Sequence, residues 1–81
     1  MQVKVIVTPR GGILDPQGKA VEHALKSLGF KGVGAVRIGK YIVLDIDAAS
    51  EQEARAAAQT MCEQLLANPL TEDFCFEVEG R

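Results

Sequence analysis

The apolar residues of this chain change their spacing several times within only 81 residues. Residues 2–8 alternate at period two, which is typical of a strand with one buried face, and valines make up that face. Helical and alternating patterns then follow one another toward the C-terminus. The expected order is strand, helix, strand, strand, helix and strand, at residues 2–8, 16–28, 36–38, 41–47, 51–67 and 72–79.

This β-α-β-β-α-β order, with right-handed crossovers, predicts an α+β fold of the ferredoxin-like class. Four antiparallel strands in the order 4-1-3-2 would carry both helices on one face. The length predicts one domain, residues 1–81. A domain of this size buries only roughly 60% of its extended-chain surface, which favours association with a second chain.

The predicted core has a sheet side and a helix side. The sheet side consists of Val3, Val5, Val7, Ile42, Leu44, Ile46, Phe74, Phe76 and Val78, with Val36 and Ile38 facing the same way. The helix side consists of Ala20, Val21, Ala24, Leu25, Leu28, Ala54, Ala57, Ala58, Met61, Cys62 and Leu65.

The first helix carries clear terminal signals. Asp15 is a favourable N-cap, and Pro16 suits the first helical position. Gly18 costs roughly 1 kcal/mol relative to alanine in a helix, so close backbone packing or a partner must favour it. Gly29 suits the left-handed position that follows a helix.

The remaining connections are also marked. Gly39-Lys40 predicts a two-residue hairpin with a type II′ turn. Ser50 and Glu53 form a capping box at the start of the second helix, and the Asn68-Pro69 pair predicts its end.

Two helices would cover one face of this sheet and leave the other uncovered. The centre of the uncovered face would hold Ile6, Tyr41, Val43 and Cys75, with charged residues around them. An apolar centre within a polar rim is typical of an interface, although single apolar residues are also common on ordinary surfaces. We predict self-association through Ile6, Val43 and Cys75.

Composition argues against several functional classes. The net charge is −2, so no basic patch favours nucleic acid, and Tyr41 is the one aromatic residue expected on the strands that an RNA-binding fold would use. The sequence contains no apolar run of the roughly 18 residues that a membrane span needs, and strand alternation begins at once, without a secretory leader. Two cysteines are too few for a disulfide framework, which predicts buried thiols in the cytoplasm.

Candidates for chemistry are few. His23 is the one histidine and has no suitably spaced carboxylate or nucleophile. Gly11-Gly12 before a helix is only a weak anion-binding signal, and the acidic group Glu72, Asp73, Glu77 and Glu79 is expected to be a solvated face. We therefore predict no catalytic residue, no metal site and no cofactor.

Three ordered tracts carry a family resemblance: Leu14 to Ala20, Val36 to Tyr41, and Cys62 to Pro69 followed by Glu72-Asp73-Phe74. In this order and spacing they resemble PurS, the small subunit of the three-part phosphoribosylformylglycinamidine (FGAM) synthase. The resemblance extends over essentially the whole chain. It departs at Thr71, where an aliphatic residue is expected, and at residues 32–35, which are less polar than expected.

The resemblance implies a subunit of an ATP-dependent glutamine amidotransferase of purine biosynthesis. Such a chain forms a homodimer or a tetramer and joins a glutaminase, PurQ, and a synthetase, PurL. The assembly converts formylglycinamide ribonucleotide, glutamine and ATP to FGAM, glutamate, ADP and phosphate. The small subunit would bridge its partners and assist ammonia transfer, without catalytic residues of its own.

On this view the matched tracts supply docking residues rather than chemistry. The expected partner-binding residues lie at the first helix start and at the predicted hairpin: Asp15, Gln17, Gly18, Lys19, Arg37, Lys40 and Tyr41. Arg and Tyr are common interface hot spots.

Two other classes share this element order. ACT domains, which sense amino acids, carry an Asp-x-Pro-Gly-like turn that Asp15-Pro16-Gln17-Gly18 partly matches. Such a module would be stabilised thermally by a free amino acid. An acylphosphatase-like enzyme would need an Arg-Asn pair near the Gly11 loop, which the sequence lacks.

Overall fold

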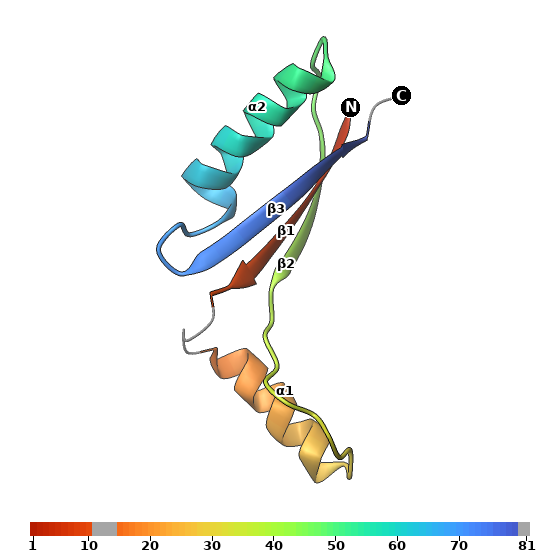
Figure 1. Ribbon diagram of the computed structural model, residues 1–81, viewed down its shortest axis with the longest axis vertical. Helices are drawn as coiled ribbons and strands as arrows, with labels where there is room; N and C mark the ends of the chain where they lie inside the picture. The colour runs from red at the N-terminus through yellow and green to blue at the C-terminus, as the bar shows by residue number, and fades with distance from the viewer. Residues whose placement is uncertain (11–14, 80–81) are drawn as a thin grey trace.

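The computed structural model describes residues 1–10 and 15–79 (Figure 1). The Gly11-Gly12 loop and Leu14 lie outside the described residues. The elements are β1 (Gln2–Pro9), α1 (Pro16–Ser27), β2 (Lys40–Asp45), α2 (Glu51–Met61), the π-helix η1 (Cys62–Leu66) and β3 (Glu72–Glu79).

The described residues form a three-stranded antiparallel sheet in the order β2-β1-β3. The central strand, β1, places Val5 opposite Ile42 on one side and opposite Phe76 on the other. These three strands are neighbours as the sequence predicts. The expected fourth strand at residues 36–38 is absent from the described part of the chain, where this segment is an irregular connection.

The core lies between this sheet and α2. Val3, Val5 and Val7 are fully buried, and Ala58 and Cys62 meet them from the helix side. Ala54 of α2 is also fully buried. Small residues at these positions let α2 lie close to the sheet, as expected from the sequence. The capping box is confirmed, because the Ser50 Oγ accepts a hydrogen bond from the Glu53 backbone N–H at 3.2 Å.

Helix α1 does not cover the sheet, contrary to the prediction that both helices share one face. It projects beyond the end of the sheet together with the segment that leads back to β2 (Figure 1). We call residues 15–39 the arm, and residues 1–10 and 40–79 the body. The stripe predicted to be buried is therefore largely open: Val21 is 38% exposed, Leu28 is 74% exposed, and Ala20 and Ala24 are also exposed.

The predicted hairpin at Gly39-Lys40 is also wrong. A type II′ turn needs a positive φ at its first central residue, and Gly39 is not among the positive-φ glycines, which are Gly29 and Gly32 in the described chain. Gly39 has another reason to lack a side chain. A Cβ there would lie 2.2 Å from the carbonyl oxygen of Val7, so the residue lets the arm connection pass against β1.

The second helix ends in a π-turn that the sequence pattern does not reveal. The backbone N–H of Ala67 donates to the carbonyl of Cys62 at 3.0 Å, five residues back. The extra residue in this turn changes the direction of the side chains within it, and Leu65, predicted to be buried, is 81% exposed. Met61, also predicted to be buried, precedes the turn and is 39% exposed.

The ends of α1 agree with the sequence. The Asp15 side chain accepts from the backbone N–H of Gly18, and Gly29 has φ +93°, the left-handed conformation expected after the helix. None of the described helices has the length and apolar character required to cross a bilayer.

Candidate functional site

The junction between α1 and the segment that returns to β2 is organised by one carboxylate. Asp15 Oδ1 accepts from the Gly18 N–H at 2.9 Å, and Asp15 Oδ2 accepts from the Ile38 N–H at 2.8 Å. The hydrogen bond from Ile38, followed by that from Gly18, lowers the pKa of Asp15 below its ordinary value. Asp15 thus joins the start of α1 to the returning segment of the arm.

Gly18 sits in the same junction and is the one buried residue of α1. A Cβ at this position would lie 2.1 Å from the carbonyl oxygen of Val36. The helix therefore rests directly on the Val36 backbone, and of the two reasons the sequence left open, close backbone packing is present. Asp15 and Gly18, both predicted to bind a partner, have demonstrable roles inside the chain.

The other predicted docking residues lie around this junction or at the adjoining end of β2. Gln17, Lys19 and Arg37 are exposed on the arm, and the Asp15–Ile38 contact brings the helix start and Arg37 into one region. Tyr41 is 62% exposed on β2. The start of α1 and Arg37 therefore lie in one region of the arm.

Lys40 is engaged within the body. Its Nζ donates to the carbonyl of Leu66 at 3.2 Å and lies 3.9 Å from Glu72 Oε1. These contacts tie the beginning of β2 to the end of η1 and the beginning of β3. The ammonium of Lys40 has a structural role that the sequence pattern did not indicate.

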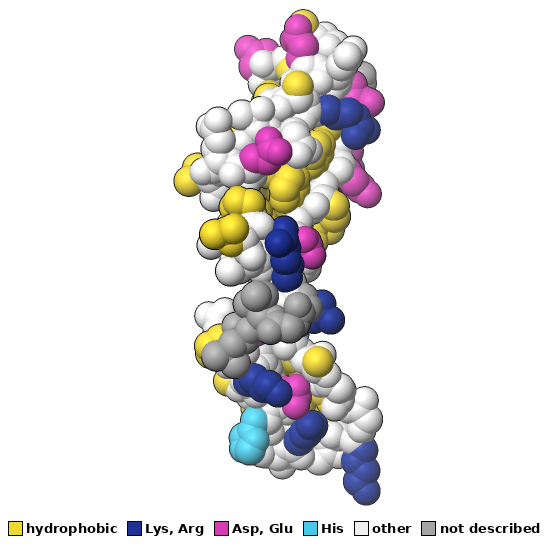
Figure 2. Space-filling view, turned by 60° about the vertical axis from the view of Figure 1, so that its left-hand side comes forward, with side chains coloured by type: hydrophobic (Ala, Val, Ile, Leu, Met, Phe, Trp, Pro, Cys, Tyr) yellow, Lys and Arg dark blue, Asp and Glu magenta, His cyan; other side chains and the backbone are white. Residues whose placement is uncertain are grey.

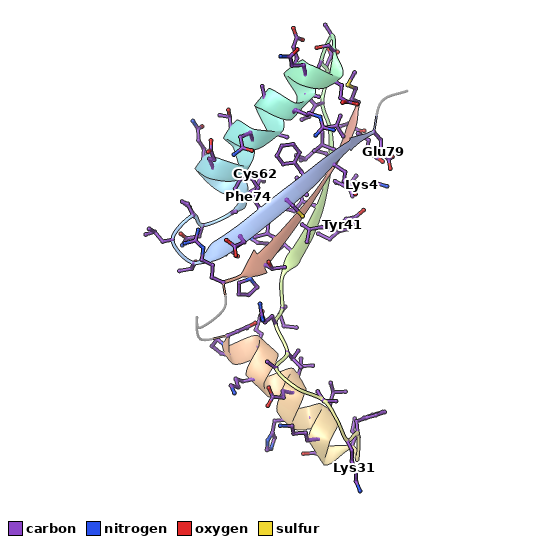
Figure 3. The ribbon with its side chains drawn as sticks, viewed as in Figure 1. Lys4, Lys31, Tyr41, Cys62, Phe74 and Glu79 are labelled. Atoms are coloured by element: carbon purple, nitrogen blue, oxygen red, sulfur yellow. The ribbon has the colours of Figure 1, made fainter. Side chains whose placement is uncertain are left out.

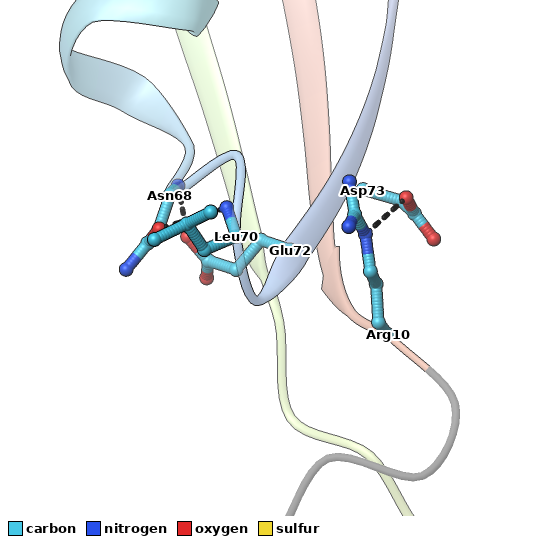
Figure 4. A network of polar contacts seen from close by, with 5 residues as sticks. All are labelled: Arg10, Asn68, Leu70, Glu72 and Asp73. Carbon is cyan, nitrogen blue, oxygen red and sulfur yellow. Dashed lines mark hydrogen bonds and ion pairs between the residues drawn. The ribbon is translucent and has the colours of Figure 1, made fainter.

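A polar turn adjoins Lys40 and exposes a leucine (Figure 4). The backbone N–H of Asn68 donates to Glu72 Oε1 at 2.7 Å, and Asn68 Oδ1 accepts from the Leu70 N–H at 3.0 Å. Arg10 Nε donates to Asp73 Oδ1 at 3.1 Å on the neighbouring side. Leu70 is 81% exposed and was not singled out from the sequence, although its place after Asn68-Pro69 in a turn indicated exposure.

The face of the sheet opposite α2 carries the predicted apolar centre. Cross-strand pairing sets Ile6 between Tyr41 and Cys75, and it sets Lys4 between Val43 and Glu77. We call Ile6, Tyr41, Val43 and Cys75 the open face. Ile6 is 46% exposed and Val43 is 49% exposed. The expected grouping is confirmed, whereas its use in self-association stays a prediction.

A charged rim borders the open face (Figure 3). Figure 3 shows Lys4, Tyr41 and Glu79 on the side away from α2, whereas Cys62 and Phe74 lie between α2 and the sheet. Lys4 Nζ donates to Glu79 Oε1 at 2.8 Å, and this hydrogen bond raises the pKa of Lys4. The open face is thus an apolar strip crossed by an exposed ion pair, the composition of an association surface.

The described residues contain little that could perform catalysis. His23 is exposed on the arm, far along the chain from both cysteines. Cys62 is buried beneath α2, and burial raises the pKa of its thiol, which disfavours the reactive thiolate. No group of three or more metal-ligating side chains occurs in the described part of the chain.

Comparison with known proteins assigns the chain to a family. Residues 2–80 match the profile of the family described as "PurS: Phosphoribosylformylglycinamidine (FGAM) synthase". The chain is 49% identical over 75 residues to the PurS subunit of Synechocystis, covering 93% of this chain and 75% of the relative. It is 47% identical over 78 residues to the PurS subunit of Bacillus subtilis, covering 96% and 92% of the two chains.

Solved structures give the same result. The Bacillus subtilis PurS structure superimposes with a TM-score of 0.86 at 47% identity, covering 98% of both chains. A chain in the structure of PurLQS from Thermotoga maritima superimposes with a TM-score of 0.81 at 29% identity, covering 95% of this chain and 96% of that one.

Proposed function

The chain belongs to the PurS family of FGAM synthase subunits, and we propose that it acts there as a non-catalytic bridge between a PurQ-type glutaminase and a PurL-type synthetase. The bridge assists transfer of ammonia for the conversion of formylglycinamide ribonucleotide, glutamine and ATP to FGAM, glutamate, ADP and phosphate. We place this assembly in the cytoplasm. The observation that carries the proposal is the superposition, over 95% of this chain, on a chain of the PurLQS structure.

The chemistry of the reaction supports a bridge. Ammonia released into water at neutral pH takes up a proton and ceases to be a nucleophile. Two active sites that share ammonia must be held in register and shielded from solvent, which requires shape and surface. The described residues supply surfaces without a paired nucleophile and base.

The proposed partner-binding surface is the Asp15 junction with its neighbours. Gln17, Lys19 and Arg37 are exposed and would contact the other subunits directly, as would Tyr41 on β2. Asp15, Gly18 and Lys40 are proposed to hold these residues in place, because their contacts lie within the chain.

The chain is further proposed to form a homodimer, with a tetramer as the next larger state. The open face provides one self-association surface through Ile6, Val43 and Cys75. Half-exposed apolar residues in adjacent rows, bordered by charges, suit pairing with a second sheet.

Reconstitution tests the bridge. The chain is mixed with the glutaminase and synthetase subunits, and FGAM formation is measured with glutamine and, separately, with ammonium chloride as nitrogen donor. Omitting the chain should lower the rate with glutamine at least tenfold more than it lowers the rate with ammonium chloride. Equal glutamine-dependent rates with and without the chain would refute the bridging role.

A paired variant locates the docking surface. Lys19→Ala with Arg37→Ala should lower ternary assembly and glutamine-dependent activity while leaving self-association unchanged. Arg55→Ala, an exposed arginine on α2 paired with Glu51, is the matched control and should assemble normally. An unaltered complex in the double variant would place the docking surface elsewhere.

A further inference from the structure

The segment between α2 and β3 exposes two leucines. Leu65 and Leu70 are each 81% exposed, more than any other large apolar side chain among the described residues. We call residues 65–70 the leucine turn. Figure 2 shows hydrophobic side chains, in yellow, at the end of the body that adjoins the arm. Because single apolar residues are common on protein surfaces, a role in binding needs support beyond exposure, and three further features of the turn supply it.

The first feature is that the core does not depend on these two side chains. Leu66 packs against the core that contains the buried valines of β1, and Ala67 is part of that core. The π-turn thus gives the core one of two consecutive leucines and leaves Leu65 in solvent. Single π-turns occur frequently at functional sites, and a leucine that the fold does not need is available to another protein.

The second feature is that the leucine turn is held in one conformation. Every backbone N–H that residues 67–72 possess donates within the chain. The Asn68 carbonyl accepts from the N–H of Thr71 at 3.1 Å and from the N–H of Glu72 at 2.8 Å, in addition to the side-chain contacts of Asn68 and Glu72 in Figure 4. A turn fixed in this way loses little conformational freedom on binding, and covering it leaves no amide unpaired.

The third feature is negative charge beside the leucines. Lys40 and Arg10 are the cations near the turn, and both are already engaged. Lys40 Nζ lies 3.9 Å from Glu72 Oε1, and Arg10 donates to Asp73. Glu63, two residues before Leu65, has no cationic partner among the described residues. The turn therefore favours a partner that brings a cation to the edge of an apolar surface.

The arm and the body differ in charge, as a bridge between two different proteins requires. The arm carries four basic and two acidic residues, whereas the described body carries four basic and nine acidic ones. The proposed docking residues Lys19 and Arg37 lie on the arm, and the leucine turn lies on the body (Figure 1). Surfaces of opposite charge select different partners and suppress the wrong pairing.

We propose that the leucine turn binds the second enzyme subunit of the assembly, the one that the arm does not hold. Leu65 and Leu70 enter an apolar pocket of that subunit, and a lysine or arginine at the rim of the pocket pairs with Glu63. This inference rests on the proposed bridging function and adds the place where the second partner binds. It also gives the third tract of the family resemblance, Cys62 to Pro69, a role in docking.

Photocrosslinking in the reconstituted complex tests the contact. The photoreactive residue p-benzoylphenylalanine replaces Leu70 in one sample and Lys19 in another, and each chain is irradiated together with the glutaminase and synthetase subunits. The Leu70 probe should crosslink predominantly to one subunit and the Lys19 probe to the other, as identified by mass spectrometry. Crosslinks of both probes to the same subunit would overturn the proposal. So would a Leu70 probe that reaches only a second copy of this chain, or nothing.

A double variant measures what the two leucines contribute. Leu65→Ser with Leu70→Ser should raise at least tenfold the chain concentration that gives half-maximal FGAM formation with glutamine, and it should leave the rate with ammonium chloride unchanged. Leu65→Met with Leu70→Met is the matched control, because methionine keeps an apolar side chain of similar volume, and it should resemble the parent.

The fold and the self-association of the double serine variant should not change, because both leucines face solvent. Circular dichroism and sedimentation check these two properties. An unchanged half-maximal concentration would overturn the proposal. Weaker self-association would do the same, because it would assign the turn to contacts between copies of this chain.

Glu63→Lys tests the charge of the pocket rim. The half-maximal concentration should rise, and the increase should be larger at low than at high ionic strength because salt screens exposed ion pairs. Glu63→Gln should give a smaller increase, since it removes the charge without reversing it. An equal or lower half-maximal concentration in Glu63→Lys would contradict a basic rim.

The two proposals fail separately. A chain that is required for glutamine-dependent synthesis but tolerates Leu65→Ser with Leu70→Ser keeps the bridge and loses the leucine turn as its contact. A chain whose Leu70 probe crosslinks to one subunit, but which can be omitted without loss of activity, keeps the contact and loses the bridge.

Discussion

Asp15 and Ile38 are 23 residues apart in sequence and are joined by a 2.8 Å hydrogen bond from the Ile38 N–H to the Asp15 carboxylate. The same carboxylate caps α1 through Gly18. One side chain therefore stabilises the helix start and fixes the returning segment against it, so that the arm behaves as a unit.

Asp15→Ala should loosen both halves of the arm together. The variant removes the acceptors of the Gly18 and Ile38 amides, so hydrogen exchange at these two amides should accelerate in parallel. Asp15→Asn keeps one carbonyl acceptor and should give a smaller acceleration. Asp73→Ala, which removes an exposed partner of Arg10, is the control and should leave both amides unchanged. Acceleration at the Gly18 amide alone would show that the hydrogen bond from Ile38 to Asp15 does not protect the Ile38 amide from exchange.

The stability of the arm should fall in acid. The pKa of Asp15 is lowered in the folded chain, so its contribution is complete above the unfolded value of about 4 and is lost as the pH falls through the folded value. Glu22 acts in the same direction through its contact with Lys26. The midpoint temperature of unfolding should therefore fall less steeply between pH 6 and pH 2 in Asp15→Asn than in the parent. The same pH dependence in the variant and the parent would contradict this assignment.

Gly18→Ala should destabilise the chain although alanine is the better helix former. A Cβ would lie 2.1 Å from a backbone oxygen, and the forced displacement should cost roughly 1–3 kcal/mol in the free energy of unfolding, measured in urea. Gly34→Ala is the matched control, because a Cβ there meets open space and the backbone is not left-handed. It should be neutral or stabilising by less than about 1 kcal/mol. Equal stability of the two variants would argue against close packing at Val36.

Val43→Glu should weaken association through the open face without unfolding the chain. Val43 is 49% exposed and lies one row from Ile6, Tyr41 and Cys75. A second sheet would therefore have to desolvate the new carboxylate, whose cross-strand neighbour Lys4 is already paired with Glu79. Sedimentation should show self-association that is weaker by at least tenfold. Glu63→Gln, on the exposed side of η1, serves as control. Unchanged sedimentation of Val43→Glu would remove the open face from self-association.

Local signals in the sequence predicted local structure well. Asp15, Gly29 and the Ser50–Glu53 pair act within a few residues, and each forms the cap that its residue type favours. Strand faces followed in the same way from alternation. The centre of the open face was predictable because the cross-strand grouping of Ile6, Tyr41 and Cys75 depends only on which strands are neighbours.

Tertiary choices were less predictable. The apolar stripe of α1 predicted packing on the sheet, whereas the helix projects beyond the end of the sheet. Gly39 is a residue type typical of turns, yet a glycine is needed there because the backbone passes close to Val7. Leu65 is directed outward by a single additional residue in a π-turn. These outcomes depend on distant backbone positions, which periodicity along one segment does not record.

The central place of β1 affects how the chain is made. Its residues leave the ribosome before those of its two neighbours, β2 and β3, which end at Asp45 and Glu79. Both flanking strands must be synthesised before this strand is paired on both sides, so the sheet is completed only after β3 has been synthesised. Until then one edge of β1, with its alternating valines, has no strand to pair with. Nascent chains are vulnerable to misassembly at this stage.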